Sequence, residues 1–502
     1  MKRLVKILGL CVLSAVIASG CMTVGPDYQV PKAPVMPEYL AYGDPLLDTT
    51  ALAAPEWWKT AFNDPILDQL VEMALAQNLS LRSAGLRVLQ ARQQLLIAIG
   101  NQYPQLQQLN GQAGIAGVVS SPAYEIYDLG FNLAWEADVW GAFKRQIESA
   151  SATLDASVAG YDGVLVSLVA QVAQTYLIIR TTQQRLAAAR RNLALQQESV
   201  RITTAKYESG EVDSLDVDQA KTLFYNTQAS VVSLELSLQQ FKNSLAILLG
   251  QPPFDMSQLL GKPQPVPTVA PEIAVGMPQD LIRRRPDIRA AERQMAAQSA
   301  QIGVAVSELY PAFGLGGTIG TSVSTNTGLS FSDLFSAQTL GYNLFGAFQW
   351  NIFQYGRLRN NIRLQDAAFQ QLLEDYRQTV LQAQGEVENA IVAFFKSQQQ
   401  LAALQSAADA AQRAADISTL QYQGGEVGYN TVILTLQALV SQQDQLAAIQ
   451  GTVTTNLVDV YRSLGGGWEV RQSQNPLDLI PDAVKDEMLE RTKYWNRTFK
   501  PD

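Results

Sequence analysis

The sequence predicts a mixed fold that joins very long α-helices to amphipathic β-strands of the membrane type. Three observations lead to this prediction. The chain of 502 residues contains an internal repeat with a period of about 215 residues. Each repeat holds two stretches in which apolar and polar residues alternate. Each repeat also holds a helical region too long for a globule.

The first twenty residues have the layout of a secretory signal. Lys2, Arg3 and Lys6 precede an apolar run, and small residues lead up to Cys21. The run is too short to span a bilayer as a helix. We therefore expect residues 1–20 to be removed and residues 21–60 to form an extended N-terminal segment.

The residues before Cys21 resemble a bacterial lipoprotein box, which implies diacylglycerol and an acyl chain on Cys21. The box usually has Leu where this chain has Ala18. An ordinary signal peptide with a chance cysteine is the alternative. Met22, in place of the Asp that retains lipoproteins in the inner membrane, implies the outer membrane.

Composition excludes several classes of function. Loss of the three cations in residues 1–20 takes the formal charge from -9 to -12, and an acidic chain without a basic stretch is a poor binder of nucleic acid. The absence of histidine excludes Ser-His-Asp catalysis and His-ligated zinc. We expect no enzyme, no cofactor and no metal. The mature chain keeps only Cys21, so no intramolecular disulfide is possible.

The repeat is seen when the chain is aligned with itself. At an offset of 215, Trp135 falls on Trp350, Gly141 on Gly356 and Tyr207 on Tyr422; further upstream the offset is 207, where Tyr103 falls on Tyr310. A loop of changed length explains the difference, because loops tolerate insertions and packed elements do not. We expect a first repeat at 61–250, a linker at 251–277, a second repeat at 278–467, and a C-terminal equatorial segment or tail at 468–502.

Each repeat begins with a helix and continues with two strands. The helices are expected from Leu67 to Gln102 and from Pro278 to Glu308, each closed by Tyr-Pro. The strands are expected at 105–139 and 312–353. Their period of two, with ten or more residues and large aromatics on the apolar face, favours a membrane barrel over a soluble sandwich.

A long helical pair completes each repeat, at 143–250 and 358–465. The pairs are rich in Ala, Gln and Leu, and both break at Tyr-x-x-Gly-Glu-Val, residues 207–212 and 422–427. A glycine at a helix C-terminus lets the chain turn back. Arms of roughly 40–65 residues would be about 60–100 Å long, as in coiled coils or helical tubes.

Four strands cannot close a barrel alone. An open edge in lipid would leave backbone groups unpaired, so identical copies must associate into a closed ring. The polar face would then line a lumen that the helices continue into the periplasm.

These features together resemble the outer membrane factor family, the TolC-like exit ducts, and in particular the lipoprotein branch that serves multidrug efflux. The resemblance covers about 22–475. The residues that carry it are Cys21, Trp57-Trp58 before Phe62-Asn-Asp-Pro-Ile-Leu67, the run Arg284-Arg285-Pro286-Asp287-Ile288-Arg289-Ala290-Ala291-Glu292, Gly303 ahead of Tyr310-Pro311, the Trp and Gly residues at the strand ends, both Tyr-x-x-Gly turns, and Leu464-Gly465-Gly466-Gly467-Trp468.

The resemblance implies a trimeric, twelve-stranded outer-membrane β-barrel, continued by a twelve-helix periplasmic tunnel. It also implies two partners, a periplasmic membrane-fusion adaptor and an inner-membrane pump, often of the resistance-nodulation-division type. In the family, acidic rings and tyrosine or arginine links close the tunnel at its periplasmic tip.

The candidate gate and docking residues lie at the two turns. The gate candidates of the first repeat are Asp213, Asp216 and Asp218, and helix capping is the alternative role for these acids, above all for Asp213. The second repeat departs from the family, with Thr431 and Leu434 at places where acids occur. Its gate candidates are Tyr429, Asn430 and Leu434, because an apolar ring can also close a pore. The expected tip turns and adaptor-docking residues are Tyr207, Gly210, Glu211, Tyr422, Gly425 and Glu426.

The expected function is therefore an outer-membrane exit duct of a tripartite efflux pump. Two alternatives are a type I protein-secretion duct and a structural coiled-coil lipoprotein of the outer membrane. The lipoprotein start favours efflux, by analogy. The coiled-coil alternative does not require two pairs of amphipathic strands at equivalent places.

Overall fold

A computed structural model describes residues 22–40, 46–50, 54–471, 474–478 and 480–499. The expected signal peptide and Cys21 lie outside these residues. The chain forms two compact units. One contains the N-terminal residues up to Lys32, Val88–Ser157 and Ala290–Arg377, and the other contains Ala33–Arg87, Val158–Arg289 and the residues from Gln378 onward.

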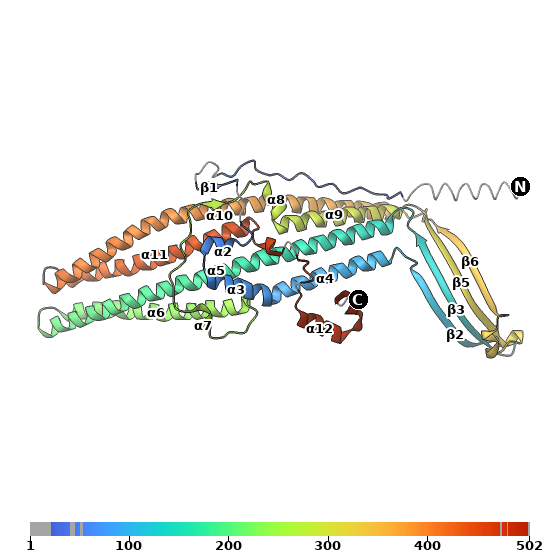
Figure 1. Ribbon diagram of the computed structural model, residues 1–502, viewed down its shortest axis with the longest axis horizontal. Helices are drawn as coiled ribbons and strands as arrows, with labels where there is room; N and C mark the ends of the chain where they lie inside the picture. The colour runs from blue at the N-terminus through green and yellow to red at the C-terminus, as the bar shows by residue number, and fades with distance from the viewer. Residues whose placement is uncertain (1–21, 41–45, 51–53, 472–473, 479, 500–502) are drawn as a thin grey trace. The chain divides into compact units, whose positions relative to one another are not determined.

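The first unit contains a four-stranded antiparallel sheet (Figure 1). Its order is β2-β3-β5-β6, so each repeat supplies one hairpin, and the hairpins meet where β3 pairs with β5. Within the described chain, β2 and β6 each have one unpaired edge. The strands are β2 (Leu106–Ala116), β3 (Tyr124–Ala137), β5 (Ala312–Ser324) and β6 (Leu340–Gln349).

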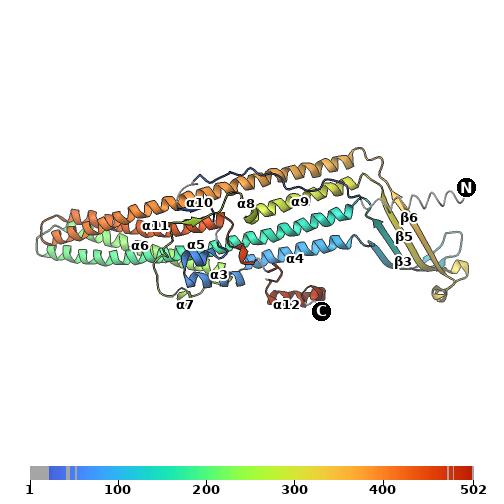
Figure 2. The same cartoon turned by 45° about the horizontal axis from the view of Figure 1, so that its top comes forward.

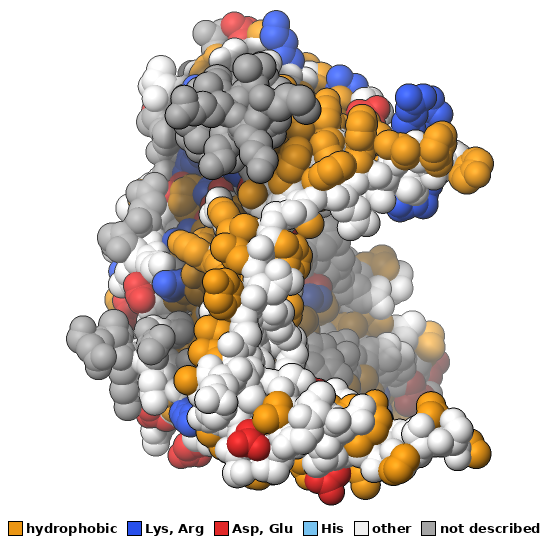
Figure 3. All heavy atoms as spheres, turned by 90° about the vertical axis from the view of Figure 1, so that its right-hand side faces the viewer, with side chains coloured by type: hydrophobic (Ala, Val, Ile, Leu, Met, Phe, Trp, Pro, Cys, Tyr) orange, Lys and Arg blue, Asp and Glu red, His pale blue; other side chains and the backbone are white. Residues whose placement is uncertain are grey.

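The sheet has one apolar and one polar face. Phe131, opposite Leu109 and Ile319, belongs to the apolar face. The next residue, Asn132, pairs with Gln108 and Thr318. None of the four strands contains Lys or Arg. Hydrophobic side chains gather in bands along the sheet, beside backbone atoms and uncharged side chains (Figure 3).

Four long helices form two hairpins (Figures 1 and 2). They are α5 (Ala142–Glu208), α6 (Ser214–Leu248), α10 (Arg357–Gln423) and α11 (Tyr429–Ser463). The long arm of each hairpin has 67 residues, which is about 100 Å, and the short arm has 35. By length and composition alone α5 could cross a membrane, but 61% of its most apolar window is buried within the chain, as in a core helix.

In the second unit, polar contacts link α5 to both α6 and α11. Arg190 of α5 pairs with Glu235 of α6, and Arg185 of α5 pairs with Asp444 of α11. Asn456 of α11 donates to the carbonyl of Ala393 in α10. Close to the hairpin ends, α6 also contacts α11 directly.

The first helix of each repeat is broken, where the sequence predicts one continuous helix. In the first repeat α3 (Pro65–Gln77) is followed by α4 (Leu79–Gly100), because the Asn78 side chain accepts the N–H of Leu81 and donates to the Leu248 carbonyl. In the second, α8 (Asp280–Arg284) and α9 (Pro286–Ser307) are separated at Arg285, which precedes proline and has ψ 120°.

The remaining segments are short. Residues 22–40 are extended, and Gln384 holds their second half through the Met36 N–H and the Pro34 carbonyl. Near the C-terminus, Arg471 pairs with the fully buried Asp162, which ties residues 468–471 to α5. The other elements are β1 (Leu47–Asp48) paired with β4 (Ile273–Ala274), α2 (Trp57–Phe62), α7 (Ser257–Leu260), the 3-10 turns Thr325–Thr327, Phe331–Phe335, Trp468–Arg471 and Lys493–Trp495, α12 (Asp482–Arg491) and α13 (Asn496–Phe499).

Candidate functional site

The two hairpin turns have the same backbone geometry. The N–H of Gly210 bonds to the Tyr207 carbonyl and that of Glu211 to the Lys206 carbonyl, at 3.0 and 2.9 Å. Gly425 and Glu426 repeat both bonds. This is the Schellman arrangement that ends helices. Both glycines have φ +79° and no heavy atom near a would-be Cβ, so glycine is required for conformation and not for space.

The first turn contains an ion pair that the second turn cannot form, because the residues differ. Lys206 Nζ lies 3.0 Å from Glu211 Oε2, and Ser209 donates to the same carboxylate. The hydrogen bond from Lys206 lowers the pKa of Glu211. Gln421 occupies the place of Lys206 in the second repeat, so only the first turn can form this pair.

Equivalent tyrosines have different surroundings at the two turns. Tyr207 is 50% exposed, whereas Tyr422 is 5% exposed. Tyr422 lies in a small core with Tyr429, their rings 5.3 Å apart and edge to face. The core takes residues from α6, α10 and α11, among them Leu223, Val432 and Leu436. The ends of the two hairpins therefore pack against each other.

Two polar contacts join the hairpins at this core. The Tyr422 hydroxyl donates to Asp216 Oδ2 at 3.3 Å, and the Tyr429 hydroxyl lies 3.0 Å from Ser199 Oγ. Lys206 Nζ lies 5.4 Å from the centre of the Tyr422 ring. Burial and then the Asp216 charge raise the pKa of Tyr422 well above its usual value. The phenol is therefore protonated at neutral pH and can donate to the carboxylate.

The three acids of the first repeat occupy different environments. Asp213 is at the N-cap of α6, but its carboxylate accepts only from the Ser214 hydroxyl and caps no backbone N–H. Asp216 is half-buried between the hairpins, and Asp218 is exposed. The structure thus brings Asp216, but not Asp218, to a tyrosine of the other hairpin.

The candidates of the second repeat also separate. Tyr429 is 1% exposed and belongs to the core, whereas Asn430 is exposed and Leu434 is 58% exposed. Asn430 and Leu434 are four residues apart and share one face of α11. Sequence reasoning missed Ser199 and Lys206. The ion pair of Lys206 could have been predicted, because an acid, Glu211, follows five residues later.

The residues that follow Cys21 are held firmly. The guanidinium of Arg145, 4% exposed, donates to the carbonyls of Val24 and Gly25 and to the carboxylates of Asp27 and Glu148. Gly25 has φ +87°, and a Cβ there would lie 2.3 Å from the Cα of Gly303. The N-terminal segment therefore packs so closely against α9 that only glycine fits at positions 25 and 303.

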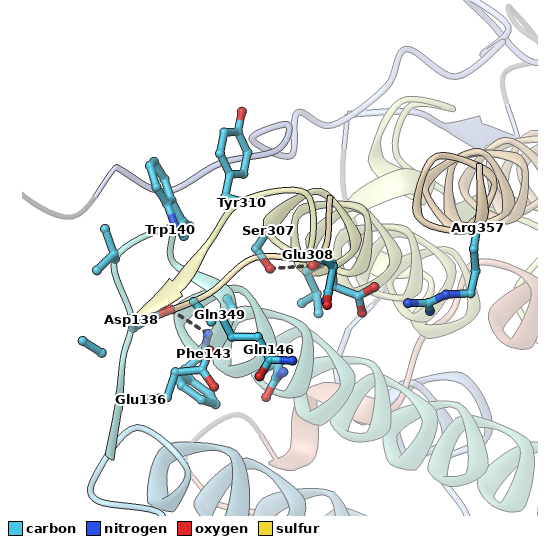
Figure 4. A pocket seen from close by; sticks show the side chains of 16 residues that line it. Glu136, Asp138, Trp140, Phe143, Gln146, Ser307, Glu308, Tyr310, Gln349 and Arg357 are labelled. Carbon is cyan, nitrogen blue, oxygen red and sulfur yellow. Dashed lines mark hydrogen bonds between the residues drawn. The ribbon is translucent and has the colours of Figure 1, made fainter. Parts of the chain in front are cut away.

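A cavity of about 450 Å³ lies where β3 and β5 meet their helices (Figure 4). Glu136, Glu308 and Arg357 line it, and Asp138, also on its wall, caps α5 by accepting the N–H groups of Phe143 and Lys144. Among the described residues, no group of three or more His, Cys, Asp or Glu could hold a metal ion. Nothing in the cavity pairs a nucleophile with a base.

Comparison with known proteins gives a consistent match. The family model described as "Outer membrane efflux protein" matches residues 70–251 and 277–466. The pyoverdine export outer membrane protein OpmQ of Pseudomonas putida is 32% identical over 436 residues, covering 84% of this chain and 89% of OpmQ. The probable outer membrane lipoprotein SilC of Salmonella typhimurium is 27% identical over 458 residues, covering 90% of this chain and 97% of SilC.

Solved structures match in fold as well. The outer-membrane channel OprN superposes with a TM-score of 0.82 at 32% identity, covering 89% of this chain and 99% of OprN. Long helices with four antiparallel strands per chain are therefore the arrangement found in solved channels of this type.

Proposed function

We propose, from the premise that the chain belongs to the outer membrane efflux protein family, that it is the exit duct of a tripartite pump for drugs or other small molecules. As a member of this family, the chain is an outer-membrane efflux channel and not an enzyme. The observation that carries the duct is the sheet, which has one apolar face and, among the residues that the structure describes, two unpaired edges. In a membrane such edges must be satisfied by further copies.

We assign three copies to the ring, which gives twelve strands and a lumen lined by the polar face. The helices α6 and α10 support association, because they expose apolar side chains: Tyr225, Val232 and Leu236 on α6, and Val392 on α10, are all 48–61% exposed. The long helices would form the tunnel between the barrel and the partners.

The gate of this duct is proposed at the hairpin ends. The bond between Tyr422 and Asp216 would hold the hairpins together when the duct is closed, with Tyr429 and Ser199 as a second bond. Asp213, Asp218, Asn430 and Leu434 are proposed to face the opening. The exposed turns at Gly210-Glu211 and Gly425-Glu426 would dock the periplasmic membrane-fusion adaptor, which connects to an inner-membrane pump of the resistance-nodulation-division type.

Lipid anchoring is proposed at Cys21. The similarity to a probable outer membrane lipoprotein supports a diacylglycerol and an acyl chain on this thiol. The hydrogen bonds from Arg145 to the Val24 and Gly25 carbonyls would then hold the segment next to the anchor at a fixed place beside the start of α5.

The function can be tested by gene deletion. Loss of the chain from its host should lower the inhibitory concentrations of several unrelated drugs about fourfold or more, and re-expression should restore them. The control is a chain with Gly250→Leu, which should lower the amount of folded protein because a Cβ there would lie 2.3 Å from the backbone oxygen of Gln77. Unchanged susceptibility together with the loss of a secreted protein from the medium would show a protein-secretion duct instead.

A further inference from the structure

A cleft lies beneath the linker between the two repeats. Its volume is about 550 Å³, within the range of sites for drug-sized ligands. One wall is the linker, which runs from α7 to β4 (Figure 1), and the other walls are α5, α10 and α11. Its apolar surface comes mainly from Pro265, Val266, Pro267 and Val269 of the linker and from Leu401 and Val453 of the helices.

We propose that this cleft binds an uncharged, apolar molecule of drug size, and that an oxygen atom of this molecule accepts the N–H of Gln398. The site is separate from the gate and is independent of what the duct exports. Three features of the cleft support it. The lining is free of charge, one buried donor lacks a partner, and the first repeat fills the equivalent place in a different way.

The lining determines the charge of the ligand. None of the described residues that line the cleft is charged. A charged group that enters an apolar site loses its hydration and finds no opposite charge there, which is costly. An uncharged molecule with a large apolar surface avoids this cost and gains from contact with the prolines, valines and leucine of the walls.

Gln398 supplies a hydrogen-bond donor that the chain does not use. Its Nε2 is buried, and within the described part of the chain it has no hydrogen-bond partner. The other glutamines of the lining are engaged. Gln184 accepts the N–H of Val266 and donates to Gln450. Gln405 donates to a carboxylate four residues later on α10. A buried donor without a partner is unfavourable, so a ligand that brings an acceptor gains a bond at Gln398.

The first repeat has charged groups at the equivalent place. At the offset of 215, Gln405 and Gln450 correspond to Arg190 and Glu235. These two residues form an ion pair, with Arg190 Nη2 2.6 Å from Glu235 Oε1. The second repeat has replaced both charges by amides, and an uncharged cleft is the result.

Gln398 also differs from its equivalent in the first repeat. That residue, Gln183, accepts a hydrogen bond of 3.0 Å from the fully buried Arg180. The position equivalent to Arg180 is Phe395, which has no donor. Gln398 therefore lacks the partner that fixes Gln183, and its amide remains available to a ligand.

The linker wall of the cleft is held at both ends. Arg180 donates to the carbonyls of Leu260 and Lys262 near its start, and β4 pairs with β1 near its end. Pro265 and Pro267 restrict the backbone between these points. A wall that is ordered before binding costs the ligand little conformational entropy.

Photolabelling with benzophenone tests the site. Benzophenone is an uncharged aromatic ketone, so its oxygen can accept from Gln398, and on irradiation it attaches to nearby C–H bonds. In the full-length chain in detergent, we expect label within 398–405 of α10 or 450–454 of α11, located by mass spectrometry of peptides. Gln398→Leu should lower this label about tenfold, because the ketone loses its donor. Gln399→Leu changes an exposed neighbour outside the lining and should leave the label unchanged.

The ion pair of the first repeat supplies a second variant. Gln405→Arg with Gln450→Glu places this pair in the cleft and should lower the label about tenfold or more, because the lining becomes charged. The variant should fold, since the same pair occurs at the equivalent place in the first repeat. The charged analogue 4-benzoylbenzoate should label the wild type about tenfold less than benzophenone does.

The outcomes separate the parts of the proposal. Loss of label in Gln398→Leu and in the double variant, with label kept in Gln399→Leu, supports the site. No label in either segment of the wild type overturns it. Equal labelling of Gln398→Leu and the wild type overturns the hydrogen bond, and equal labelling by the two probes overturns the preference for uncharged ligands. Labelling is measured without any drug susceptibility, so the cleft can fail while the duct stands, and the reverse.

Discussion

At the scale of residues, two equivalent tyrosines differ in burial and in bonding. Tyr207 and Tyr422 occupy the same place in the repeat, yet Tyr422 is buried between the hairpins and bonded to Asp216, whereas Tyr207 is half-exposed. The difference arises from their neighbours, since Tyr422 packs on Tyr429 and the position equivalent to Tyr429 is Ser214. The two repeats have therefore kept the tyrosine and placed it in different surroundings.

Removing one hydroxyl tests this bond. Tyr422→Phe should weaken closure by about 1 kcal/mol, the usual worth of one hydrogen bond, while the packing of the ring remains. Basal conductance in planar bilayers should rise several-fold. Because the pKa of Tyr422 is raised in the folded protein, the stabilising contribution of the bond is complete below the ordinary tyrosine pKa of about 10 and is lost as the pH rises from there through the raised pKa. The same opening should therefore occur in the wild type at strongly alkaline pH.

The repeat supplies the matched control. Tyr207→Phe removes the same atom from the exposed tyrosine and should leave conductance unchanged. If both variants conduct like the wild type, the Tyr422 bond does not hold the tip closed. If both conduct more, the effect belongs to the turns in general.

At the scale of elements, the periodic spacing of apolar residues and the repeated turn motif predict the strands and the helical hairpins well. Alternation locates both strand pairs, and Tyr-x-x-Gly-Glu-Val locates both turns, because glycine at φ +79° is a local requirement. The break at Asn78 depends partly on its bond to the Leu248 carbonyl, about 170 residues away, so local pattern could not establish it. The break at Arg285 could have been predicted from the sequence, because this residue precedes a proline. The bond between Tyr422 and Asp216 needs two hairpins packed together, so sequence alone could not predict it.

The turn glycines allow a test of backbone geometry. Gly210→Val and Gly425→Val force a β-branched residue into the left-handed region, at roughly 1–2 kcal/mol, in a turn where no neighbour would clash. Stability should fall little, because the turns are exposed. Docking of the adaptor should fail, and drug resistance should drop at unchanged protein level.

Asparagine tolerates the left-handed region, so Gly210→Asn and Gly425→Asn serve as controls and should retain resistance. Valine variants that match the asparagine variants in resistance and in cross-linking to the adaptor would exclude these turns as the docking tip.

At the scale of the whole molecule, a ring of copies gives single residues a collective effect. Asp218 is exposed and Leu434 is 58% exposed in one chain. Threefold assembly would bring three copies of each around the opening, where like charges attract cations and apolar side chains exclude water. Asp216, which is bonded to Tyr422, would contribute to closure and less to the charge of the opening.

The two kinds of ring should respond differently to substitution. Asp218→Asn should lower cation selectivity and weaken block by multivalent cations, with little change in basal conductance. Leu434→Ser should raise basal conductance, because water can enter a ring that has lost its apolar side chains, and should leave selectivity largely unchanged. Reversal potentials in salt gradients and single-channel currents measure the two properties separately. If Asp218→Asn leaves both properties unchanged, its carboxylate does not face the opening; if Leu434→Ser does, the apolar part of the gate lies elsewhere on α11.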